Sequence, residues 1–187
     1  RDALVRFCEE NAVAYELCGK VIVATTESEI PQLEELYRRG TENGLNGLRR
    51  LGAEEIREFE PHAAGIQGIR VPGTGIVDYR KVAEKYAELV RSRGGKILLS
   101  HEVTALRRSG GNTILETTGG AVEAKLVINC AGLQSDRVSR MAKAKLDLTI
   151  VPFRGEYYDL VPARHDYLKG LLYPVPDPQF PFLGVHF

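Results

Sequence analysis

The stretch Leu126–Asp136, LVINCAGLQSD, decides the fold class of this chain, because an apolar run ends there in two small residues and a helix is predicted to begin at once. In α/β proteins, a strand, a tight turn and a helix start in this order bind nucleotide phosphates. Ala131 and Gly132 have almost no side chain, so a ligand can approach the backbone, and the free N–H groups of the following helix favour an anion. Other α/β proteins make the same turn only to pack a helix closely on a sheet, so the neighbouring elements have to distinguish the two interpretations.

The sequence around this stretch predicts an α/β layer. A long amphipathic helix is expected from Tyr79, with Asp78 as its N-cap, and the glycine pair at 94–95 ends it. The elements predicted next are strands at 96–99, 103–107, 113–117 and 122–128, and a helix at 134–143. Glycine pairs mark the turns between the last three strands, which indicates a β-meander beside a parallel sheet.

Strand-rich segments flank this layer on both sides. The expected N-terminal elements are a short helix, a hairpin of strands at 13–17 and 20–24, a helix from Glu29 capped by Ser28, strands at 48–51 and 66–71, and a helix at 53–59. The expected C-terminal elements are strands at 149–160, 171–175 and 182–187. We therefore expect an α/β fold class, α+β overall, in which the chain crosses between domains more than once.

Composition excludes several classes of function. The 187 residues are 43% hydrophobic, and 25 basic residues balance 25 acidic ones, so the whole-chain charge offers no general attraction to nucleic acid or to an anionic membrane. No apolar run approaches the roughly 20 residues of a membrane span. Cys8, Cys18 and Cys130 are odd in number and lack metal-ligand spacing, so we expect small buried apolar residues, no metal site and a reducing compartment.

Five motifs, in a fixed order, connect the chain to a known family. They are GKVIVA at 19–24, GTGIVDY at 73–79, VINCAG at 127–132, VPFRGEYY at 151–158, and YPVP at 173–176 continuing to GVHF at 184–187. Their order resembles the D-amino-acid-oxidase-like, FAD-dependent oxidoreductases. The PFRGEYY and PFLGVHF stretches resemble the branch of that family that oxidises L-2-hydroxyglutarate.

The resemblance implies two incomplete domains. Residues 79–145 would be part of a Rossmann-like FAD-binding domain, and residues 12–78 and 146–187 would be two segments of a substrate domain with a mixed or antiparallel sheet. The helix within residues 1–11 would pack on the FAD-binding domain. The family's G-x-G-x-x-G loop, which binds the FAD diphosphate, has no counterpart in this sequence. Together with the start at Arg1 and the apolar end at Phe187, we interpret this as an internal piece of a longer protein.

The resemblance also assigns cofactor-binding residues. The backbone of Val103 would contact the adenine, and Ala131 and Gly132 would lie beside the phosphates of FAD. The alternative for Val103 is a core side chain, and both roles are compatible.

Three further residues are candidates for the substrate site. Arg154 lies in a predicted apolar strand, where a buried guanidinium needs an anion; a dicarboxylate substrate or a salt bridge to Glu156 or Asp159 would serve equally. By resemblance Tyr173 would reach the substrate carboxylate, and its alternative is a core aromatic residue. His186 is the candidate catalytic base, because an imidazole near neutral pKa suits removal of a hydroxyl proton; its alternative is a structural strand histidine.

The function expected from these observations is the oxidation of L-2-hydroxyglutarate to 2-oxoglutarate by hydride transfer to FAD, with oxygen or a quinone as electron acceptor. One alternative keeps the fold and changes the substrate to an amine or amino acid. Another is a non-catalytic nucleotide-binding or interaction module. We expect a cytoplasmic protein, with peripheral contact to the inner membrane face as an option, no nucleic-acid partner, and an isolated fragment that is inactive.

Overall fold

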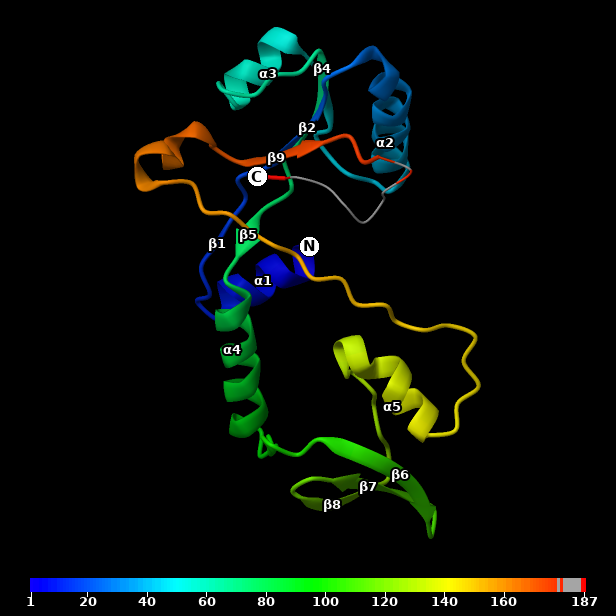
Figure 1. Cartoon of the computed structure of the whole chain (residues 1–187). Helices are drawn as coiled ribbons and strands as arrows, with labels where there is room; N and C mark the ends of the chain where they lie inside the picture. The colour runs from blue at the N-terminus through cyan, green and yellow to red at the C-terminus, as the bar shows by residue number, and fades with distance from the viewer. Residues whose placement is uncertain (178, 180–185) are drawn as a thin grey trace. The chain divides into compact units, whose positions relative to one another are not determined.

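The computed structural model describes residues 1–177, 179 and 186–187. It divides into two compact units, Arg1–Glu88 with Asp159–Phe187, and Leu89–Tyr158 (Figure 1). The mixture of helices with mixed and antiparallel sheets confirms the expected fold class. The assignment of residues 12–78 and 146–187 to a substrate domain and of 79–145 to an FAD-binding domain stays a prediction.

A four-stranded mixed sheet forms the centre of the first unit. Its strands, in spatial order, are β3 (Arg49–Gly52), β4 (Gln67–Val71), β2 (Lys20–Ala24) and β9 (Leu171–Pro174). β4 runs antiparallel to β2 and β3, whereas β9 runs parallel to β2. Leu172 of β9 also exchanges two backbone hydrogen bonds with Phe187, at 2.8 and 2.9 Å. Phe187 therefore lies beside β9, on the side away from β2.

Alternation of side chains gives this sheet two apolar faces, and a helix packs on each. Val21 and Val23 point to one face and pack with Ile56 of α3 (Ala53–Phe59). Ala24 points to the other face and packs with Leu33 of α2 (Ile30–Glu42). The two helices flank the sheet in Figure 1. These two clusters hold β2 between the helices, in register with β9.

A smaller cluster joins the chain start to α4 (Tyr79–Ser92). α1 (Asp2–Glu10) contributes Cys8, which is buried with Val82 of α4, and β1 (Tyr15–Glu16) pairs with β5 (Ile76–Val77) beside them. The rings of Phe7 and Tyr86 stack with centroids 4.4 Å apart. An Asp78 carboxylate oxygen accepts the backbone N–H groups of residues 80 and 81, which confirms the predicted N-cap of α4.

The second unit contains the predicted β-meander. Its antiparallel strands are β6 (Val103–Ser109), β7 (Asn112–Thr117) and β8 (Gly120–Ala124). A 3-10 turn η2 (Gly132–Gln134) leads into α5 (Ser135–Met141), which contacts β6. A further 3-10 segment, η3 (Pro162–Tyr167), belongs to the first unit and precedes β9.

Two local predictions were wrong in the N-terminal part. Strands 13–17 and 20–24 do not pair as a hairpin, because β1 pairs with β5 and β2 pairs with β4 and β9. The helix after residue 28 is not capped by Ser28. Instead Thr26 and Glu29 form a capping box around η1 (Glu27–Glu29), in which the Glu29 carboxylate accepts the Thr26 N–H at 3.1 Å. The glutamate three residues after a threonine is the sequence signal that identifies this cap.

The predicted strands at 96–99 and 149–160, and the 126–128 end of a third, are also wrong for this chain. These residues form no strand, and Leu126 and Ile128 are each 77% exposed. An apolar extended segment becomes a strand only when a neighbour supplies hydrogen bonds, and no described residue does so here. Cys130 is likewise exposed rather than buried, while Cys8 is buried as expected. The predicted strand at 182–187 falls largely outside the described residues.

None of the helices within the described ranges combines the length and the apolar character needed to cross a bilayer.

Candidate functional site

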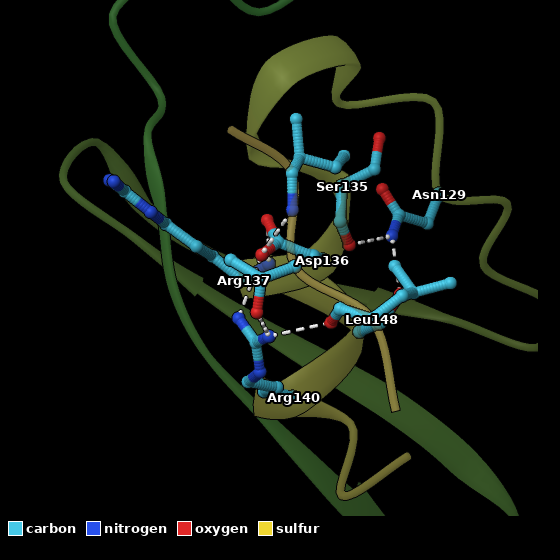
Figure 2. A network of polar contacts seen from close by, with 9 residues as sticks. Asn129, Ser135, Asp136, Arg137, Arg140 and Leu148 are labelled. Atoms are coloured by element: carbon cyan, nitrogen blue, oxygen red, sulfur yellow. Dashed lines mark hydrogen bonds and ion pairs between the residues drawn. The ribbon is translucent and has the colours of Figure 1, made fainter. Parts of the chain in front are cut away.

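The turn between residues 129 and 135 is shaped by the side chain of Asn129. Its carbonyl oxygen accepts the Ala131 N–H at 3.1 Å, and its amide donates to the Ser135 carbonyl at 2.8 Å and to the Ser139 hydroxyl at 3.0 Å. Figure 2 shows this side chain pointing back at the start of α5. An asparagine that bonds its own backbone two residues on stabilises a tight turn. Asn129 thereby fixes the backbone of Ala131 and Gly132 against α5.

Asp136 ties the same helix to the segment that follows it. One carboxylate oxygen accepts the Arg137 N–H at 2.8 Å; the other accepts the Arg140 guanidinium at 2.8 Å and the Ile150 N–H at 3.3 Å. Arg140 also donates to the carbonyl of Leu148 at 2.9 Å (Figure 2). Burial raises the pKa of Asp136, but the hydrogen bonds from Arg140, Ile150 and Arg137 outweigh it, so the pKa of this carboxyl lies below its ordinary value.

The geometry of this turn suits a close backbone approach by a ligand. Gly132 has φ +56°, and a Cβ placed on it would have nothing within 4 Å. Its N–H makes no hydrogen bond within the described part of the chain. The start of α5 differs from expectation in one respect, because the Asp136 carboxylate already occupies the N–H of Arg137. Any anion beside this turn would therefore be held by the turn backbone rather than by the helix start.

Val103 begins β6 opposite Thr117, next to an irregularity in the strand register. Its side chain is half-buried. The contact of its backbone with the adenine of FAD stays a prediction.

The first unit brings two of the predicted substrate-site residues together. The rings of Tyr173 and His186 stack with centroids 4.8 Å apart and an angle of 9° between their planes. Lys20, which the sequence interpretation did not single out, lies with its ammonium nitrogen 4.9 Å from the centroid of the Tyr173 ring. Burial lowers the pKa of this ammonium below its ordinary value. Sequence motifs separated by about 150 residues thus meet at one aromatic ring.

Arg154 is in a different environment from the one predicted. Its segment is not a strand, its side chain is 88% exposed, and its guanidinium lies 3.9 Å from the Glu156 carboxylate. This ion pair corresponds to the alternative that the sequence left open. An exposed pair of this kind contributes little to stability, so it leaves the guanidinium able to exchange partners. The substrate role of Arg154 stays a prediction.

Three residues important to these sites were missed at the level of sequence: Lys20, Asn129 and Asp136. Lys20 had a signal, because a lysine opens the otherwise apolar strand GKVIVA. Asn129 also had one, since asparagine before two small residues favours a turn closed by its side chain. Asp136 had none, because its partners at 140 and 150 are set by the path of the chain. Among the described residues, no group of three or more His, Cys, Asp or Glu is arranged to hold a metal.

Comparisons with known proteins identify the family of this chain. A family profile described as FAD dependent oxidoreductase, DAO, matches residues 1–187. L-2-hydroxyglutarate dehydrogenase of Indibacter alkaliphilus is 51% identical over 98% of this chain and 46% of its own length. The mitochondrial L-2-hydroxyglutarate dehydrogenase of Homo sapiens is 41% identical over 98% of the chain and 42% of its own length. The chain therefore spans about half the length of the curated relatives that it matches.

Solved structures share the fold at lower identity. L-proline dehydrogenase of P. horikoshii superimposes with a TM-score of 0.75 at 15% identity, covering 92% of this chain and 47% of its own. Glycine oxidase of Geobacillus kaustophilus does so with a TM-score of 0.70 at 23% identity, covering 95% and 50%. At such identities the likeness concerns the fold alone.

Proposed function

The chain belongs to the FAD dependent oxidoreductase family DAO, and from this we propose that the full-length protein carrying it, here called the parent, oxidises L-2-hydroxyglutarate to 2-oxoglutarate. The observation that carries the proposal is the 51% identity to an L-2-hydroxyglutarate dehydrogenase over nearly the whole chain. The contact between Tyr173 and His186 supports it, because two residues predicted for one substrate site are neighbours in space.

The residues of this chain have distinct tasks in the proposed reaction. When bound, FAD supplies the hydride acceptor. His186 accepts the proton of the substrate hydroxyl at an imidazole nitrogen, so that the C2–O bond becomes a carbonyl as C2 loses its hydride. Tyr173 orients the substrate beside His186, and Arg154 contributes a positive charge for a carboxylate. Oxygen or a membrane quinone then takes up the electrons, in the second case through peripheral contact with a membrane.

The cofactor contacts proposed for this chain are the turn at Ala131 and Gly132 and the strand end at Val103. The open space over Gly132 and its unengaged N–H fit a phosphate group close to the backbone. They supply only part of a dinucleotide site, because the sequence contains no G-x-G-x-x-G loop. We therefore propose that this chain alone does not turn over substrate.

The test uses the parent. Purified protein is expected to show flavin absorbance, and anaerobic addition of L-2-hydroxyglutarate is expected to bleach it. Glycine, sarcosine and L-proline should leave it coloured; bleaching by one of these alone would replace the 2-hydroxy acid with an amine or amino acid as substrate. Bound flavin with no reducing substrate in this panel would favour a binding module.

A matched pair of variants tests the role of His186. His186→Gln should lower kcat by about two to four orders of magnitude while FAD stays bound, since a positioned base contributes that much. His62→Gln, in a loop of the first unit, should keep wild-type kcat. Equal activity of the two variants would remove His186 from the proposed role.

A further inference from the structure

Three side chains form a polar row across the sheet of the first unit. Tyr173 of β9 lies opposite Ile22 of β2 in the parallel register, so the two side chains share a face. Lys20 precedes Ile22 by two residues and points to the same face. Because Phe187 and Leu172 form a hydrogen-bonded antiparallel pair, His186 lies opposite Tyr173 on that face as well. The stacking of His186 on Tyr173 and the position of Lys20 at the same ring agree with this register.

Lys20 is the residue of this row whose positive charge has no carboxylate partner among the described residues. Its side chain is half-buried, and no carboxylate of the described residues lies within 4.0 Å of its ammonium. The Tyr173 ring at 4.9 Å offsets part of the desolvation cost through its π-face. A partly desolvated ammonium is normally paired with an anion, and the burial that lowers its pKa is the sign of that cost.

The row is reachable by a ligand. Tyr173 and Lys20 are half-buried and His186 is exposed, so the polar groups reach the surface of the unit. Lys20 also lines a cavity of about 590 Å³, which the row borders at Lys20 and which Tyr173 and His186 do not line. The Lys20 ammonium lies 4.9 Å and the His186 ring centroid 4.8 Å from the Tyr173 centroid, so an anion that paired with Lys20 would lie beside the ring on which His186 stacks.

We infer that Lys20 is a substrate-binding residue that pairs with a carboxylate of the substrate, on the same side of the sheet as Tyr173 and His186. The inference deepens the proposed function and rests on it for the identity of the substrate. L-2-hydroxyglutarate carries two carboxylates, so one can pair with Lys20 while its hydroxyl faces His186. A side chain in a central strand is positioned more rigidly than one in an exposed coil, so Lys20 is a better anchor than Arg154.

The experiment measures carboxylate binding in the oxidised parent with glutarate as the probe. Lys20→Met keeps most of the side-chain volume and removes the charge, and should weaken glutarate binding, followed by flavin absorbance and by calorimetry, by about tenfold or more. Lys20→Arg should restore part of this loss. Lys81→Met, which removes an exposed lysine of α4, should bind like the wild type.

Turnover separates a binding role from a structural one. Lys20→Met should raise KM for L-2-hydroxyglutarate by about tenfold and change kcat by less than about threefold, with the melting temperature unchanged. Unaltered glutarate binding, or a fall in melting temperature and kcat with KM unchanged, would overturn the inference. The monocarboxylate L-2-hydroxybutyrate identifies the carboxylate: a rise in KM for L-2-hydroxyglutarate alone assigns the distal one, and a rise for both assigns the one next to C2.

The two proposals fail separately. If the wild-type parent does not oxidise L-2-hydroxyglutarate but Lys20→Met still loses glutarate binding, the substrate identity is wrong and the role of Lys20 stands. If the wild type oxidises L-2-hydroxyglutarate and Lys20→Met binds glutarate normally, the function stands and the role of Lys20 is wrong.

Discussion

β2 of the first unit and residues 126–128 of the second are both apolar segments, but only β2 is buried in a sheet. Val21 and Val23 of β2 are 0% and 6% exposed, whereas Leu126 and Ile128 are each 77% exposed. β2 has a hydrogen-bonding strand on each side and a helix on each face; residues 126–128 have neither within the described chain. The apolar character of a segment is therefore not enough to bury it or to make it a strand. Neighbouring strands and helices decide both.

The largest expected difference between the two regions is in their stability. Ile56→Ala, at a fully buried position of the first core, should lower the free energy of unfolding by about 3 to 4 kcal/mol, because it leaves a cavity between α3 and the sheet. Ile128→Ala should change it by less than about 0.5 kcal/mol. Urea unfolding of the 187-residue chain, followed by circular dichroism, measures both. A comparable cost for Ile128→Ala would show that residues 126–128 are packed in solution.

The second largest effect is expected at the turn that follows residues 126–128. Gly132→Ala should cost about 1 to 2 kcal/mol, because an alanine at φ +56° is strained although nothing obstructs its Cβ. Gly94→Ala is the matched control, since Gly94 has φ +82° and equally open surroundings. Both variants should lose similar stability in urea unfolding.

The same pair of variants tests the cofactor role. Only Gly132→Ala should also weaken FAD binding by the parent, measured by the flavin retained after dialysis. Equal retention by the two variants would separate this turn from the cofactor site.

Sequence predicted α3 and the start of α4 well because the signals for both are local. The boundaries of α3 and the Asp78 cap of α4 follow from residues within one helical turn. The hairpin of 13–17 with 20–24 was wrong because both strands pair with segments about 50 or more residues away. Such pairings depend on the packing of the whole sheet, which local patterns do not contain.

In the candidate site, too, local motifs identified residues, whereas their contacts depend on segments that are distant in the sequence. Tyr173 and His186 were named from motifs, but their stacking follows from the pairing of Leu172 with Phe187, which no local pattern predicts. Arg154 was expected in a buried strand, and its charged neighbour Glu156 instead lies with it in an exposed coil. A lysine at the start of an apolar strand marks Lys20 as unusual, but its position beside Tyr173 follows only from the pairing of β9 with β2.

A smaller effect is expected at the start of α2, where the cap differs from the prediction. Thr26→Ala should lower stability by about 1 kcal/mol, because it removes the side chain that accepts the Glu29 N–H in the capping box. Ser28→Ala should cost less, since among the described residues the Ser28 hydroxyl has a hydrogen bond only with that of Thr26. Thermal unfolding of the two variants compares them directly. A larger loss of stability for Ser28→Ala than for Thr26→Ala would support Ser28 as the N-cap, as the sequence predicts.

The smallest effect is local and depends on pH. Because the pKa of Asp136 is lowered from 3.8 in the folded chain, its carboxylate stabilises the fold above that value, and this contribution is lost as the pH falls through the lower, folded-state pKa. The N–H resonance of Ile150, which donates to this carboxylate, should report the loss in an NMR titration. Its midpoint should lie below 3.8, and Asp136→Asn should abolish the transition. A midpoint at or above 3.8 would mean that burial outweighs the hydrogen bonds that the Asp136 carboxylate accepts from Arg140 and the backbone.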